Sequence, residues 1–90
     1  AWDEIWNRPG LDPRTRRLLV LAITAALGRW EEFDLHVGSG LAAELQVTEL
    51  KELMMLTAVY AGVPAANPGL ANVRRHLAAP GQSTAGEPKR

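Results

Sequence analysis

Apolar residues recur at helical spacing along this chain, and the residues between the apolar runs mark helix ends. Residues 2–11 form a first segment that closes in a Pro-Gly turn. Asp12 followed by Pro13 is typical of an N-cap with proline at the first helical position. The pattern predicts a helix from there to about Leu27, with Gly28 as the left-handed residue that ends it.

The second half of this helix, residues 18–27, is apolar on every side apart from Thr24. A helix that is apolar all round is normally buried all round. A chain of 90 residues buries only a limited share of its own surface. We therefore expect a partner subunit to cover part of this helix.

Two further helices are expected after it. The first runs from about residue 30 towards residue 45, with a bend or break at Gly38-Ser39-Gly40, because glycine lowers helix propensity by up to about 1 kcal/mol relative to alanine. The next covers residues 49–61, with Thr48 as its N-cap.

A last helix is expected between about residues 64 and 77. Proline is unfavourable inside a helix, so Asn67 is expected as the cap and Pro68 as the first position. Residues 80–90 are rich in Pro, Gly, Ser and charge, and are expected to be disordered. No alternation favours strands, so the sequence predicts one all-α domain over residues 1–79.

Composition excludes several classes of function. Lys plus Arg and Asp plus Glu number ten each, which argues against a nucleic-acid or anionic-membrane partner. No apolar run approaches the roughly 20 residues that span a bilayer. The absence of cysteine removes thiol chemistry and fits a reducing cytoplasm. Two histidines without clustered carboxylates give no reason to expect a metal centre.

One polar constellation has the spacing of a catalytic site. Arg29, Glu32 and His36 fall within roughly 60° of one helix face, and Glu32 and His36 are four residues apart and can touch. A carboxylate beside an imidazole sets its tautomer and raises its pKa, while burial lowers it. Gly40, one turn beyond His36, leaves room for a ligand. The plainer alternative is an exposed ion pair of small value.

Other polar residues are weaker candidates. The cluster Arg14, Arg16 and Arg17 either binds a carboxylate substrate or is simply solvated, and solvation is the simpler interpretation. Tyr60 and Asn67 flank the turn at residues 62–64. A third group, His76 near a helix end, is interpreted as structural.

The motifs together resemble the carboxymuconolactone decarboxylase family over about residues 2–77. The matching segments are Ile5-Trp6-x-Arg8-Pro9-Gly10-Leu11, Arg14-Thr15-Arg16-x-Leu18, Ala26-Leu27-Gly28-Arg29, Glu32-Phe33-x-Leu35-His36 and residues 58–67. Related alkylhydroperoxidases carry Cys-x-x-Cys-x-x-x-His, and here Arg29 and Glu32 stand in the place of those cysteines. Thiol peroxidase chemistry is excluded because no thiolate is present.

The resemblance implies an alkylhydroperoxidase-like helical bundle that assembles as a homo-oligomer, a trimer or hexamer. It implies conversion of 4-carboxymuconolactone to β-ketoadipate enol-lactone and CO₂ in protocatechuate breakdown, without a cofactor. His36 is then the proton donor, oriented by Glu32, and Arg29 or Arg16 holds a substrate carboxylate or the dienolate oxygen. Tyr60 and Asn67 are further pocket residues.

Three departures from the family pattern accompany this resemblance. The family has another helical segment before residue 2, so the chain is expected to be a fragment or part of a fusion with an enol-lactone hydrolase. The segment at residues 37–47 is about two residues longer than usual, and Pro68-Gly69 replaces a helix-favouring pair. The alternatives are a non-catalytic assembly module of the family and a related decarboxylase for another small acid.

Overall fold

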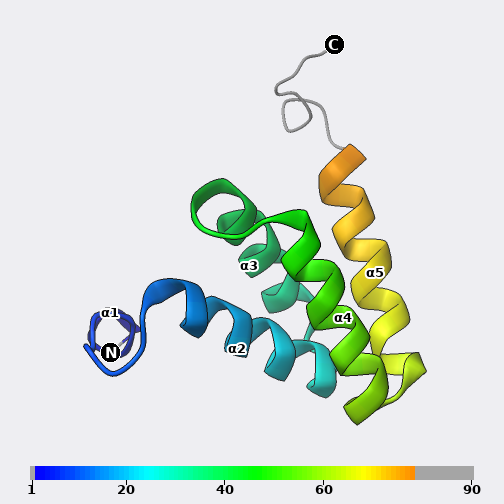
Figure 1. Ribbon diagram of the computed structural model, residues 1–90, viewed down its shortest axis with the longest axis horizontal. Coiled ribbons are helices and arrows are strands. Elements are labelled where there is room, and N and C mark those ends of the chain that lie inside the picture. Colours follow the sequence, from blue (N-terminus) through cyan, green and yellow to red (C-terminus); the bar gives the residue numbers. More distant parts are fainter. Residues whose placement is uncertain (1, 79–90) are drawn as a thin grey trace.

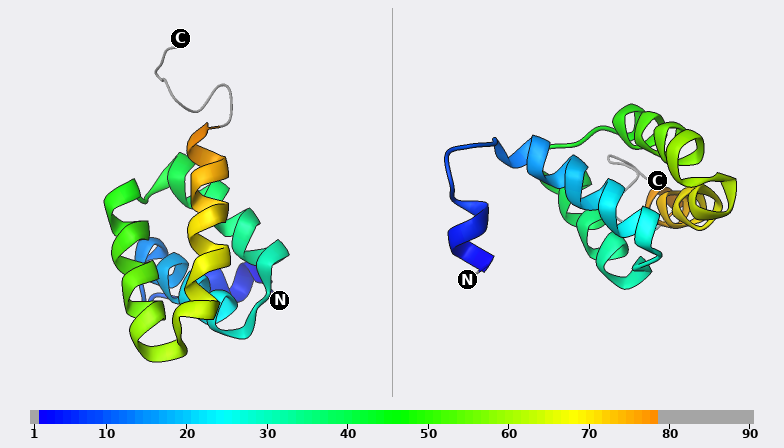
Figure 2. Two further views of the ribbon diagram at one scale, coloured as in Figure 1. Left: turned by 90° about the vertical axis from the view of Figure 1, so that its right-hand side faces the viewer. Right: turned by 90° about the horizontal axis from the view of Figure 1, so that it is seen from below.

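Five helices make up the part of the chain that the computed structural model describes, residues 2–78. They are α1 (Trp2–Trp6), α2 (Pro13–Leu27), α3 (Trp30–Ala43), α4 (Val47–Ala61) and α5 (Val63–Ala78). The four longer helices pack together, with α2 against α3 and α4, and α5 against α2, α3 and α4 (Figure 1). The short α1 lies beyond the start of α2, to one side of the bundle (Figure 2). The expectation of an all-helical protein is confirmed for these residues, and the predicted disordered tail lies outside them.

Helix α2 begins and ends where the sequence predicts. Asp12 caps it by accepting a hydrogen bond from the Thr15 backbone N–H at 2.7 Å, and Pro13 is its first residue. Gly28 ends the helix in the left-handed region at φ 73°, a conformation that glycine adopts without a Cβ clash.

Helix α3 continues through the two glycines, where a bend or break was expected, and ends at Ala43. The glycines serve close packing here. A Cβ on Gly40 would lie 2.8 Å from Leu45 Cδ1 and 3.3 Å from Arg17 Cγ, and a Cβ on Gly38 would lie 3.2 Å from His76 Cε1. The space beside Gly40 is therefore filled by protein and does not hold a ligand, which corrects the sequence-based expectation.

The starts of the last two helices also differ from the prediction. Helix α4 begins at Val47, and the Glu49 carboxylate accepts from the Gln46 N–H at 2.8 Å, so Thr48 is inside the helix. Helix α5 includes Pro68 instead of starting there. A proline inside a helix removes one backbone hydrogen bond. Packing stabilises this turn, because the buried Gly69 lies directly against Met54.

The core fills the space between α2, α3, α4 and α5. Its buried members are Leu21, Ala25, Phe33, Val37, Leu45, Leu50, Leu53, Met54 and Val73. Burying each large side chain contributes about 1.5–3 kcal/mol. Helix α2 is not buried all round within one chain, since Leu19, Ile23 and Leu27 are about half exposed. No helix among residues 2–78 has the length and apolar character needed to cross a bilayer.

Candidate functional site

A pocket of about 380 Å³ lies where α1, α2 and α3 meet. It brings together the three residues of the predicted constellation, Arg29, Glu32 and His36. Its other lining residues are mostly apolar: Trp6, Val20, Ile23, Thr24 and Leu27. The pocket therefore has apolar walls and carries an arginine, a carboxylate and an imidazole, which suits a small organic anion. We call it the His36 pocket.

The hydrogen-bond partner of His36 is Arg17, which the sequence did not predict. Arg17 Nη1 lies 2.6 Å from His36 Nδ1. Among the described residues no hydrogen bond joins Glu32 to His36, so the expected orienting contact is replaced by one from α2. The Trp6 ring stacks on the imidazole, with centroids 5.8 Å apart and planes 14° from parallel.

The contact with Arg17 fixes the protonation of the ring. A guanidinium has donors only and cannot accept a hydrogen bond. His36 Nδ1 must therefore be the acceptor, and the proton of the neutral imidazole lies on Nε2. The pocket wall thus presents a neutral ring with one N–H donor.

The electrostatic surroundings agree with a neutral ring. Burial lowers the pKa of His36 below its ordinary value of 6.5, and the Arg17 cation lowers it further. Glu32 and Glu44 act in the opposite direction but do not prevail. Glu32 and burial were expected from the sequence to act on the pKa of His36, but the effect of the Arg17 cation was not.

Arg17 is itself held from several sides. Its Nε donates to Glu44 Oε1 at 2.7 Å, and its guanidinium carbon lies 4.9 Å from the centre of the Trp6 ring. Solvation was the simpler expectation for Arg17, but its side chain is only 16% exposed. A signal was present, because Arg17 lies four and seven residues before Leu21 and Thr24, which share the buried face of α2.

The two predicted substrate arginines occupy different places. Arg29 is exposed and lines the His36 pocket. Arg16 does not line it, and donates instead to the carbonyl oxygens of Arg8 and Leu11. Arg16 therefore tethers the turn between α1 and α2.

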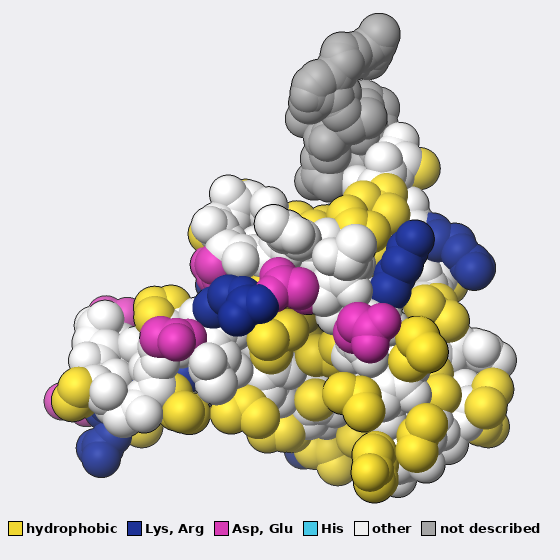
Figure 3. Space-filling model, viewed as in Figure 1, with side chains coloured by type: hydrophobic (Ala, Val, Ile, Leu, Met, Phe, Trp, Pro, Cys, Tyr) yellow, Lys and Arg dark blue, Asp and Glu magenta, His cyan; other side chains and the backbone are white. Residues whose placement is uncertain are grey.

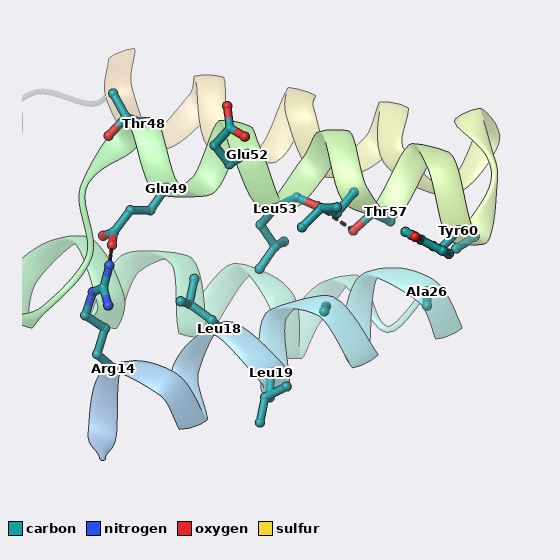
Figure 4. Close-up of a pocket in the computed structure, with 13 residues that line it drawn as sticks. Arg14, Leu18, Leu19, Ala26, Thr48, Glu49, Glu52, Leu53, Thr57 and Tyr60 are labelled. Carbon is teal, nitrogen blue, oxygen red and sulfur yellow. Dashed lines mark hydrogen bonds and ion pairs between the residues drawn. The ribbon is translucent and has the colours of Figure 1, made fainter. Parts of the chain in front are cut away.

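Tyr60 and Asn67 do not line the His36 pocket within one chain. Tyr60 is 85% exposed and borders a second, larger depression of about 680 Å³ between α2 and α4, which we call the α2–α4 groove. Figure 4 shows Arg14 paired with Glu49 at one end of this groove and Tyr60 at the other. Apolar side chains cover much of this face (Figure 3). The groove is larger and also contains Glu52, but its arginine is paired with Glu49 and no histidine lines it, so the His36 pocket is the better candidate for chemistry.

His76 has a structural contact, as the sequence suggested. Its Nε2 donates to Asp34 Oδ1 at 2.8 Å and so joins α5 to α3. This hydrogen bond lowers the pKa of Asp34.

The fold and pocket define an all-helical protein with an imidazole, a carboxylate and an arginine around one small cavity. The sequence model of the carboxymuconolactone decarboxylase family matches residues 1–79. This match shows that the chain belongs to that family.

Two curated relatives are similar over most of this chain. The 4-carboxymuconolactone decarboxylase of Acinetobacter baylyi is 43% identical over 67 residues, which are 74% of this chain and 50% of that protein. The nitrosuccinic acid decarboxylase of Metarhizium robertsii is 36% identical over 64 residues, 71% of this chain and 45% of that protein. The chain thus spans about half the length of these relatives. No solved structure gives a significant match.

Proposed function

We propose that this chain carries the active site of a cofactor-independent decarboxylase acting on 4-carboxymuconolactone. The observation that carries the proposal is the meeting of His36, Glu32 and Arg29 around one pocket with apolar walls. Family membership and the name of the bacterial relative support the choice of substrate class. The substrate supplies its own electron sink, so the residues need only bind it, stabilise charge and deliver one proton.

In this proposal the bond between the ring carbon and the carboxylate breaks, and CO₂ leaves without the bonding electron pair. That pair moves through the conjugated ring and places negative charge on the lactone carbonyl oxygen. A proton is then added to a ring carbon, which gives the enol-lactone. The dicarboxylate thus loses CO₂ and gains one proton.

Each pocket residue takes one part of this reaction. Arg29 binds a substrate carboxylate. Neutral His36 donates a hydrogen bond from its Nε2–H to the oxygen that becomes negative, and it keeps the proton. This role suits an imidazole that stays uncharged. Glu32, exposed at the pocket, orients a solvent water that gives one proton to carbon, and the hydroxide that remains is neutralised by solvent. This assignment differs from the sequence-based one, in which His36 gives up the proton, because Arg17 disfavours the imidazolium that such a donor requires.

The direct test is to incubate the 90-residue chain with 4-carboxymuconolactone and to follow CO₂ and enol-lactone. Activity should be present in the parent chain and strongly reduced in His36→Ala and Glu32→Gln. Full activity in both variants would remove the site assignment. No activity in the folded parent chain would favour the non-catalytic assembly module.

A second candidate is decarboxylation of a different small acid. The name of the fungal relative, a nitrosuccinic acid decarboxylase, motivates it. Parallel assays with nitrosuccinic acid and 4-carboxymuconolactone decide between the two, since the better substrate will have the larger kcat/KM.

Self-assembly is part of the proposal. Helices α2 and α4 expose apolar side chains that a second copy would cover: Leu19, Ile23, Leu27, Met55, Leu56, Val59 and Tyr60. The family resemblance suggests a trimer or hexamer, which sedimentation equilibrium measures. A role for Tyr60 or Asn67 in substrate binding would require a site shared between subunits.

On the basis of the same resemblance, we propose that the reaction belongs to protocatechuate breakdown and takes place in the cytoplasm. An enol-lactone hydrolase, fused or separate, would consume the product there.

A further inference from the structure

We propose that Arg17 is a positioning residue for His36, which fixes the ring as the neutral tautomer with its proton on Nε2. The inference rests on the proposed function, in which that N–H serves the reaction. Arg17 does not line the His36 pocket, so it acts through the imidazole and not on the substrate.

The geometry gives Arg17 little freedom to do anything else. Its Nε is bound to Glu44 at 2.7 Å, its Nη1 is 2.6 Å from His36 Nδ1, and its charged plane lies over Trp6. An ion pair with Glu44 alone would hold α2 against the end of α3 without reaching the ring. The second donor, aimed at Nδ1, is what makes the contact specific for one tautomer.

Protonating Nδ1 would break this contact and place two cations side by side. The charged groups around the ring are Arg17 from α2, Glu32 and Glu44 from α3 and its end, and Arg29 at the pocket. The two carboxylates favour the imidazolium, but Glu44 is bound to Arg17 and Glu32 makes no hydrogen bond to the ring among the described residues. The closest charge is therefore the one that disfavours protonation.

The stack of Trp6 on His36 adds a second constraint. It covers one face of the ring with an aromatic plane 14° from parallel, which limits rotation of the imidazole. Arg17 contacts both rings, so one side chain orients the imidazole of His36 and the Trp6 ring stacked on it. Replacing Arg17 should release both.

The test reads the tautomer directly. Histidine ring ¹⁵N chemical shifts of the parent chain at pH 7.5 should show His36 with a protonated Nε2 and a bare Nδ1. His76 is the internal reference, because its Nε2 must donate to Asp34. A His36 ring that is doubly protonated, or protonated on Nδ1, would overturn the proposal.

Two substitutions and one control sharpen this test. Arg17→Met should allow a mixture of tautomers, whereas Arg17→Lys keeps a cationic donor and should preserve the parent form. Arg14→Gln removes a cation from the same helix that is paired with Glu49, and should leave the His36 spectrum unchanged. An unchanged tautomer in a folded Arg17→Met chain would overturn the proposal.

Kinetics separate positioning from mere stability. Arg17→Met should lower kcat roughly 10- to 100-fold with a smaller change in KM. It should also move the acidic limb of the pH profile to higher pH, since a cation that lowers the pKa of His36 is gone. Arg17→Lys should restore the limb. A lower rate with an unmoved limb would mean a structural role only. The spectra need no turnover, so an inactive chain with the predicted tautomer would contradict the proposed function and leave the tautomer assignment standing.

Discussion

The two histidines of this chain meet partners of opposite charge. His36 on α3 accepts a hydrogen bond from the Arg17 cation, whereas His76 on α5 donates one to the Asp34 carboxylate. Both rings are partly buried and both contacts join different helices. His36 lines a pocket, and His76 fills the space beside Gly38.

The difference teaches which neighbour decides the chemistry of an imidazole. The carboxylate four residues away on the same helix, Glu32, is the neighbour that a sequence reveals. The partner that fixes the tautomer of His36 comes from another helix, 19 residues earlier. A carboxylate partner would have made His36 resemble His76, a structural donor.

The largest expected contrast is in kcat/KM, between a variant that lacks the His36 ring and one that lacks the His76 ring. His36→Ala should lower kcat/KM about 10²- to 10³-fold, as loss of one donor to a developing oxyanion does. His76→Ala should lower stability and leave kcat/KM within about 3-fold, since it touches no substrate in this account. Steady-state kinetics on both folded variants checks the pair, and equal losses would contradict the contrast.

A smaller effect is expected from replacing the two glycines that pack near the histidine contacts. Gly40 lies beside Arg17, the partner of His36, and Gly38 lies beside the ring of His76. Gly40→Ala places a Cβ against Leu45 and the stem of Arg17, and should cost about 1–2 kcal/mol of unfolding free energy after the helix-propensity gain. Gly38→Ala meets one ring carbon of His76 at 3.2 Å and should change stability by less than about 1 kcal/mol. Urea denaturation compares the two, and a reversed order would show that the packing is misassigned.

Whether a structural feature could be predicted from the sequence depends on whether its contacts lie within one helix or between helices. Signals confined to one helix, such as Asp12, Pro13 and Gly28 around α2, predicted the structure well. Residues whose role depends on another helix were missed. The two glycines of α3 make room for side chains from other segments, and Arg17 has its role through His36 on α3. Pro68 is the same case, because packing at Gly69 outweighs local propensity.

The candidate site divides in the same way. Arg29, Glu32 and His36 were predicted because they share one face of α3 or its start, and they do share a pocket. Trp6 and Arg17 come from other helices and were not predicted as site residues. Arg16 tethers a turn, and the roles of Tyr60 and Asn67 stay predictions.

The smallest expected effect concerns the structural histidine. The pKa of Asp34 is lowered, so its contact with His76 contributes stability above the ordinary carboxyl pKa of 3.8 and loses it as pH falls through the lower folded value. Asp34 is 47% exposed, so Asp34→Asn should cost only about 0.5 kcal/mol at pH 7. Urea unfolding at pH 7 and pH 3 measures this, and a deficit that persists undiminished at pH 3 would contradict the assignment.

The most direct test of a neutral, Arg17-held His36 is the pH dependence of kcat/KM for 4-carboxymuconolactone, with His36 titrated by NMR over the same range. The pKa of His36 is lowered below 6.5, so the active neutral form dominates at pH 7 and above. We predict that kcat/KM is constant at pH 7 and above. It should decline as pH falls through the pKa of His36 measured by NMR, which should itself be lower than 6.5. Activity that instead falls as pH rises through that pKa would mean that the imidazolium is the working form, and would contradict the account.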